Sequence, residues 1–324
     1  MKRFILNNEE QIKKWVDTVK DKQTILNIYG QSIEEMQKII DNPVNSISPL
    51  DKDYSYRINV ARNITILAMA IAIKTEIFPE NYKDIIVEIQ VGNLDEPKLY
   101  KTQGDHRIKN GKSVSSLYLN ALVDLASGDI SLFLDALGVF AHELFHAKQY
   151  FNSQRKELSI SNLIYSLEHI AYYDDYKENY NNIFYETEAF YNGYLFAIEF
   201  MRHILSKNSY SKENSLIYKN RLISIAMKNR PNWQSNLFDF ETQCNYVKKL
   251  LNIIEQKNIT ISPQILNKYP ILKIVFDNNG ILYEKTKIVN FLSKQLSNNK
   301  FEESEQKLFN LLIDVFNDNR IKKK

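Results

Sequence analysis

The stretch "AHELFHAKQYF" (Ala141–Phe151) places two of the chain's five histidines four residues apart, with a glutamate directly after the first. Residues four apart lie one turn apart on the same face of an α-helix, so His142 and His146 would point in the same direction. Apolar residues recur around them with the period of a buried helix: Leu134, Leu137, Phe140, Ala141, Leu144 and Phe145. The pattern therefore predicts a core-facing helix over about residues 132–152.

Two imidazoles at this spacing can bind one zinc ion, each through a ring nitrogen. Glu143 lies on the adjacent face, where it can reach a water at the metal but is badly placed to be a ligand. The alternative is a pair of partly exposed histidines that neighbouring groups satisfy. We favour the metal, because two histidines and a glutamate on a core-facing helix are otherwise costly to bury.

A catalytic zinc ion needs a third protein ligand and leaves its fourth position to water. The longer motif H-E-x-x-H-x-x-G-x-x-H is absent, since Gln149 and Asn152 occupy its glycine and last histidine positions. The single cysteine, Cys244, excludes an internal disulfide and a cysteine-based zinc cluster. A carboxylate from a later helix is therefore the expected third ligand.

The later stretch "NIFYETEAFYNGYLFA" (Asn182–Ala197) offers two glutamates, Glu186 and Glu188. Residues two apart on a helix point about 200° apart, so only one of them can face the metal. The helix face of Glu186 is apolar and contains small residues that let another helix approach: Ile183, Ala189, Phe190, Gly193, Ala197 and Phe200. A metal offsets the expense of a carboxylate on such a face, so Glu186 is the predicted ligand and Glu188 the second choice.

H-E-L-F-H-A-K-Q followed by E-T-E-A resembles the gluzincin division of zinc metallopeptidases, whose third ligand is a glutamate on a following helix. The resemblance covers about residues 131–206 and implies a zincin-like core with one catalytic Zn²⁺ bound by His142, His146 and Glu186. It implies that Glu143 is the general base of a zinc-dependent metalloendopeptidase acting on a protein or peptide. In this family a strand ahead of the motif helix pairs with extended substrate, and "SSLYLN" (Ser115–Asn120) has the corresponding place in the chain.

The chain departs from this family four residues after the third ligand, where Phe190 replaces an aspartate that usually orients a ligand histidine. The orienting group is therefore expected elsewhere. A tyrosine or histidine would stabilise the oxyanion, and none is singled out among the candidates His169, Tyr173, Tyr185, Tyr191, Tyr194 and His203. His106, in "GDHRIKNG", is predicted to lie in a loop.

The composition predicts a mainly α (α+β) fold. The 324 residues are 44% hydrophobic but include only eight glycines and seven prolines, too few turn residues for an all-β architecture. Strands are expected over 84–91 and 115–123, and later helices over 159–173, 181–206, 212–229 and 239–257. We expect an N-terminal helical region over 1–80, a metallopeptidase core over 81–258, and a small α/β extension over 259–324 with a hairpin at 271–284 and two helices.

The charge and hydropathy of the chain indicate which classes of partner it could bind and in which compartment the protein could be found. The net charge of +3 comes from interspersed charges, which does not favour nucleic-acid binding. The longest apolar run, Ile64–Ile73, is half the length of a membrane span and indicates a buried core helix. The first residues, "MKRFILNNEEQIKKWV", lack the apolar stretch of a signal peptide, so we expect a cytoplasmic protein or one exported by another route. The oligomeric state is left open.

Two alternatives to an active peptidase stay open. The zinc site could be catalytically degenerate, which would make the chain a zinc-binding module. The long amphipathic helices at 212–229 and 239–257 could instead serve a helical protein-interaction module without a metal. A further hypothesis within the peptidase reading is a bacterial effector or toxin protease.

Overall fold

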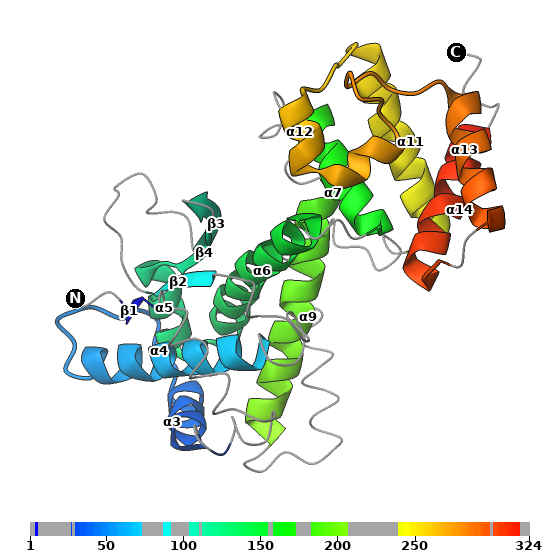
Figure 1. Cartoon of the computed structure of the whole chain (residues 1–324). Helices are drawn as coiled ribbons and strands as arrows, with labels where there is room; N and C mark the ends of the chain where they lie inside the picture. Colours follow the sequence, from blue (N-terminus) through cyan, green and yellow to red (C-terminus); the bar gives the residue numbers. More distant parts are fainter. Residues whose placement is uncertain are drawn as a thin grey trace. The chain divides into compact units, whose positions relative to one another are not determined.

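The computed structural model describes residues 4–5, 27, 30–72, 87–91, 104–109, 112–154, 158–172, 183–206, 239–298 and 301–317 (Figure 1). The strands in this part of the chain are β1 (Phe4–Ile5), β2 (Val87–Val91), β3 (Gly104–Lys109) and β4 (Lys112–Leu117). Its helices are α3 (Gly30–Asp41), α4 (Tyr54–Ile71), α5 (Leu119–Ser127), α6 (Ile130–Gln154), α7 (Ile160–Ala171), α9 (Phe184–Ser206), α11 (Phe240–Gln256), α12 (Pro263–Lys268), the 3-10 helix η6 (Pro270–Ile274), α13 (Lys285–Asn298) and α14 (Glu303–Asn317). The prediction of a mainly helical protein is confirmed.

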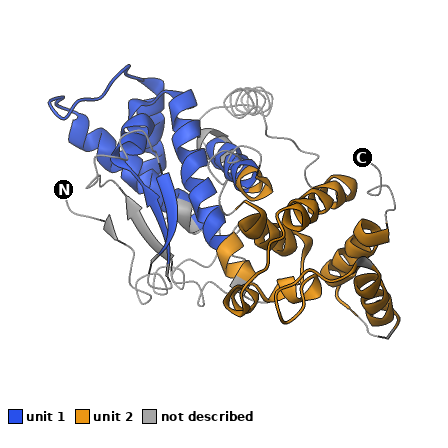
Figure 2. Cartoon of the chain, turned by 90° about the horizontal axis from the view of Figure 1, so that it is seen from above, with its two compact units in different colours: residues 1–148, 189–233 blue, residues 149–188, 234–324 orange. Residues whose placement is uncertain are grey.

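Two compact units divide the chain (Figure 2), and neither is continuous in sequence. Unit 1 comprises Met1–Lys148 and Ala189–Trp233, and unit 2 comprises Gln149–Glu188 and Gln234–Lys324. The long helices α6 and α9 each contribute residues to both units. The units therefore do not follow the expected division into 1–80, 81–258 and 259–324. A division made from the sequence assumes that each unit is one continuous segment, whereas each unit here consists of two segments.

The sheet of unit 1 has the strand order β1-β2-β4-β3. β2 and β4 are parallel, whereas β1 is antiparallel to β2 and β3 is antiparallel to β4, so the predicted small mixed sheet ahead of the motif helix is confirmed. β4 lies between two other strands, so both of its edges are already paired. The expectation that Ser115–Asn120 pairs with substrate is therefore wrong, and β3 is the strand at the edge of the described sheet.

The second predicted strand is only half correct. The chain is extended as far as Leu117, but Leu119–Ser127 forms α5 instead of continuing the strand to residue 123. Ala121, Leu122 and Leu125 are buried in α5 at helical spacing, which their apparent alternation in the sequence conceals. The polar strand β3 was not predicted, and the first predicted strand is observed over Val87–Val91, its earlier residues lying outside the described part of the chain.

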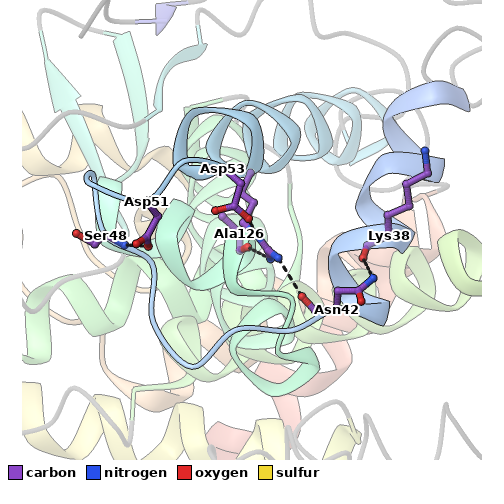
Figure 3. A network of polar contacts seen from close by, with 7 residues as sticks. Lys38, Asn42, Ser48, Asp51, Asp53 and Ala126 are labelled. Atoms are coloured by element: carbon purple, nitrogen blue, oxygen red, sulfur yellow. Dashed lines mark hydrogen bonds and ion pairs between the residues drawn. The ribbon is translucent and has the colours of Figure 1, made fainter.

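The N-terminal helices of unit 1 pack through apolar faces and one buried arginine. The apolar run at 64–73 lies mostly in α4, where Ile64 and Leu67 are fully buried, as predicted for a core helix. Arg57 of α4 donates to the backbone oxygens of Ala126 (3.3 Å) and Asn42 (3.0 Å) and pairs with Asp53 (2.6 Å). Figure 3 shows this network, which connects α4 to the ends of α3 and α5.

Unit 2 has its own apolar core, formed mainly by α7, α11, η6, α13 and α14. Among its fully buried members are Leu163, Val247, Leu250, Leu272, Leu292, Leu308 and Leu312. Two helices end this unit, as predicted, but the expected hairpin at 271–284 is reduced to an isolated bridge between Phe276 and Leu282. The apolar stretch before the turn forms η6 instead, where it packs on α7 and α12.

One helix in the described part of the chain is long and apolar enough to cross a membrane. This segment is Ile130–Ser153 of α6, and 78% of its most apolar window is buried inside the structure. Because the core helix of a globular protein meets the same test, this is weak evidence for a membrane span.

Candidate metal centre

The middle of α6 carries the candidate metal-binding group. His142, Glu143 and His146 are 1%, 8% and 4% exposed, so all three are buried. The Nε2 atoms of the two histidines are 2.9 Å apart, and Glu143 Oε1 is 4.0 Å from His142 Nε2. The three potential ligand atoms lie within 4.8 Å of one another. The helix spacing therefore brings both imidazoles and the carboxylate to one point, as predicted from the sequence.

This geometry fits a divalent metal ion. Two nitrogens at about 2.0–2.1 Å from a tetrahedral ion such as zinc are about 3.3 Å apart, close to the observed separation of the two Nε2 atoms. Imidazole nitrogens suit zinc, copper, iron and nickel alike.

Helix α9 approaches His142 closely from one side. A Cβ atom at Gly193 would lie 2.7 Å from the His142 backbone nitrogen and 2.8 Å from the Gly138 oxygen, so only glycine permits this approach. One turn earlier on α9, the ring of Phe190 stacks on the His142 imidazole, with centroids 3.9 Å apart and planes 30° apart. The expected close approach of another helix to this face of α9 is confirmed, and the aromatic ring of Phe190 lies against His142.

The sheet of unit 1 covers Glu143. Ser115 of β4 donates from Oγ to the backbone oxygen of Glu143 at 3.0 Å. At the start of β3, a Cβ atom on Gly104 would lie 3.1 Å from Glu143 Cγ and 3.2 Å from Val139 Cγ1. The strands therefore fix both the backbone and the side chain of the proposed base.

His106 is a site residue that the sequence prediction missed. It lies in β3 instead of a loop, and its ring centroid is 5.9 Å from that of His146. Its Nε2 is 2.8 Å from Ser113 Oγ of β4. Nothing in the sequence pattern signals this position, because only the pairing of β3 with β4 brings His106 beside the motif helix.

Most of the other histidines and tyrosines considered for the oxyanion have packing roles or lie outside the described residues. Tyr194 donates to Asp135 at 2.6 Å and packs against Gly138, which makes it part of the contact between α9 and α6. His169 lies in an aromatic cluster of unit 2 with Tyr165 and Tyr269. The structure does not describe Tyr173 or the side chain of His203.

The two candidate glutamates are in the first turns of α9, in the part that belongs to unit 2. Glu186 is 3% exposed. Glu188 is half-buried and accepts from Gln149 Nε2 (2.8 Å) and Ser161 Oγ (3.4 Å). These bonds give Glu188 a structural role within unit 2. Neither glutamate belongs to the group of described residues whose potential ligand atoms lie within 4.8 Å of one another, so the third ligand stays a prediction.

A third glutamate, Glu168 of α7, caps the N-terminus of α9. It accepts from the backbone nitrogens of Phe184 (2.5 Å) and Tyr185 (3.0 Å) and from the hydroxyl of Tyr246. Burial raises the pKa of Glu168 to about 8, against the opposing effect of these three donors. The cap fixes the helix turn that contains Glu186, and nothing in the motif pattern pointed to it.

No model of a known protein family, no curated protein and no solved structure matches this chain.

Proposed function

We propose that this chain is a zinc-dependent metalloendopeptidase that hydrolyses peptide bonds in a protein or peptide, with α6, α9 and the sheet forming a zincin-like core. The supporting observation is the convergence of the His142 and His146 Nε2 atoms, 2.9 Å apart, beside the buried carboxylate of Glu143. A helix that only packed into a core would not be expected to gather three polar side chains at one buried point.

We assign the zinc ligands as neutral His142 and His146 with ionised Glu186. Glu186 lies one helical turn before Phe190, so the two side chains share a face of α9. Because Phe190 stacks on His142, this face is the one that is turned toward the motif helix. A zinc ion in such a site acts as a Lewis acid toward water and toward the peptide carbonyl.

Glu143 is the general base in this proposal. It takes a proton from the attacking water as the water oxygen bonds to the carbonyl carbon, and it passes that proton to the leaving nitrogen as the C–N bond breaks. The second water proton also ends on the leaving nitrogen, so the products are a carboxylate and an ammonium group, and Glu143 returns to its ionised form. Its burial under β3 holds the carboxylate in one position for both transfers.

We assign substrate pairing to β3 in place of Ser115–Asn120. β3 pairs with β4 alone among the described strands, which leaves its other side as the edge of that sheet. An extended peptide can add to such an edge through backbone hydrogen bonds. The start of the same strand contacts Glu143, so a peptide on this edge would run past the base.

The direct test compares two variants of the purified protein, Glu143→Gln and His142→Ala. Glu143→Gln is expected to keep zinc and to lose about 10²–10⁴-fold in turnover of a fluorogenic peptide mixture, because a general base contributes about that much. His142→Ala is expected to lose the zinc itself. Wild-type protein that cleaves no peptide but holds zinc would leave only the second function below.

A zinc site without catalysis is the second candidate, and the stacking of Phe190 on His142 in place of an acidic partner is the observation that favours it. A binding or regulatory module would depend on the metal for its shape and not on the Glu143 carboxylate. Glu143→Gln would then behave as wild type in every assay that His142→Ala abolishes.

A further inference from the structure

His106 faces the motif helix from the edge strand. Side chains of a strand alternate between faces, so His106 shares its face with Gly104, which contacts Glu143. Its cross-strand partner is Ser115, whose hydroxyl reaches the Glu143 backbone oxygen. Three residues of two strands thus place His106 on the side of the sheet that covers the candidate metal centre.

The His106 ring lies beside the metal-binding group and is not part of it. The group of described residues whose ligand atoms lie within 4.8 Å of one another consists of His142, Glu143 and His146. The ring of His106 is 5.9 Å from His146, centroid to centroid, and tilted by 41°. It is half-buried, so part of the ring is open to a bound molecule.

We propose that His106 is a catalytic residue of this site, which donates a hydrogen bond to the substrate carbonyl oxygen as negative charge develops on it. The inference rests on the proposed peptidase function. The role of His106 also extends that proposal, because the proposed site otherwise has no assigned hydrogen-bond donor for the carbonyl oxygen. A donor that is fixed before the reaction stabilises such a charge at no cost of reorganisation.

The proposed role needs the Ser113 hydroxyl to be the donor in its contact with His106. The Ser113 hydroxyl is 2.8 Å from His106 Nε2 and can donate to it. A neutral imidazole that accepts at Nε2 carries its proton on Nδ1, which makes Nδ1 the donor. Ser113 therefore acts as a positioning residue, and its loss should weaken the effect of His106 without abolishing it.

The experiment measures the affinity of acetohydroxamate for zinc-loaded protein by calorimetry, alongside the zinc affinity of each variant. Acetohydroxamate carries an anionic oxygen to a zinc site and needs no knowledge of the substrate sequence. We expect His106→Ala to bind it about 10-fold or more weakly, since hydrogen bonds to charged groups contribute about that factor. His106→Gln, which keeps an N–H donor, should recover most of the loss, and Ser113→Ala should show a smaller loss.

Arg107→Gln is the matched control, because it alters the neighbouring residue on the opposite face of β3, where Arg107 donates to Tyr118 at 2.8 Å. It should leave both affinities unchanged, and all variants should bind zinc as wild type does. Wild-type affinity for acetohydroxamate in His106→Ala would overturn the role of His106 while leaving the peptidase proposal intact. Loss of zinc in that variant would also overturn it, by making His106 a ligand. A wild-type protein without zinc would overturn the proposed function and this inference together.

Discussion

The ring of Phe190 stacks on the imidazole of His142, one of the two histidines of the candidate metal-binding group. An acidic residue would orient the His142 ring through one of its nitrogens and make it a stronger ligand. An aromatic ring restricts the same imidazole through its flat face, 3.9 Å away, and adds no charge. The orientation of His142 is therefore kept, but the strengthening of the ligand is not.

Phe190→Ala should weaken zinc binding by about 3–10-fold, because aromatic contacts of this kind contribute about 0.5–1.5 kcal/mol. The measurement is a competition titration with a fluorescent zinc chelator. Leu195→Ala, at an exposed position of the same helix, is the control for a general effect on α9 and should bind zinc as wild type does. Unchanged zinc affinity in Phe190→Ala would show that the stacking does not hold the ligand.

Gly104→Ala should reduce turnover without loss of zinc. The added methyl group would lie 2.9 Å from the Ser116 oxygen and 3.1 Å from Glu143 Cγ, so the base must move. Because the shift at Glu143 is a few tenths of an ångström, the rate should fall by less than the roughly 10²-fold that a displacement of about 1 Å costs. Peptidase assays with zinc-loaded protein test this, with Leu50→Ala at an exposed position of unit 1 as the control.

At the scale of elements, the contact of α9 with α6 places Phe190 against His142 of the candidate metal-binding group. The two helices meet at Gly138 and Gly193, and neither position has room for a larger side chain. The capping of α9 by Glu168 fixes its first turn independently of that contact. The glycine contact and the Glu168 cap lie at different points along α9, the first in unit 1 and the second in unit 2.

Gly193→Ala should destabilise the protein by about 1–3 kcal/mol, because overpacking at a close contact forces backbone movement. The Cβ atom would lie 2.7 Å from the His142 nitrogen, so zinc affinity should fall as well. Urea unfolding monitored by circular dichroism gives the first quantity and chelator competition the second. A stable variant with normal zinc affinity would contradict the assigned helix contact.

The cap at Glu168 should make the stability of unit 2 depend on pH. Its pKa is about 8 in the folded protein and 4.5 ordinarily, so between these values the folded state binds more protons than the unfolded state. The free energy of unfolding should therefore be highest below about pH 4.5 and should fall as the pH rises toward about 8. At about 1.4 kcal/mol per pKa unit the change amounts to several kcal/mol.

Hydrogen exchange of peptides from α7 and the start of α9, corrected for the intrinsic effect of pH, measures this stability locally. In Glu168→Gln the side chain cannot titrate, so the loss of protection between about pH 4.5 and 8 should disappear. The same pH dependence in the variant and the wild type would assign the effect to another group.

The helices and the strand could be predicted to different degrees for physical reasons. α11 follows from apolar periodicity because it buries one face, whereas α6 and α7 follow from their apolar content, since both are buried on nearly all sides in their middle. β3 is short, polar and at the edge of the sheet, so nothing in its pattern separates it from a loop. His142, Glu143 and His146 could be predicted because helix spacing alone brings them together. His106 and Glu168 could not, because only pairing between distant elements brings them into place.

At the scale of the whole molecule, two units share the two long helices that bear the proposed ligands. A metal that binds only the folded state adds to its stability in proportion to the logarithm of metal concentration over Kd. Removal of zinc by a chelator should therefore lower the melting temperature of the wild-type protein. The same treatment should leave His142→Ala unaffected, since that variant is expected to melt as the metal-free protein does.

The zinc content of purified protein tests the central claim most directly. Elemental analysis should find one zinc ion per chain in the wild type and in Glu143→Gln, and none in His142→Ala. A wild-type protein without stoichiometric zinc, even after reconstitution with the metal, would contradict the account, and the two histidines would then be core residues that bond only to each other and their neighbours.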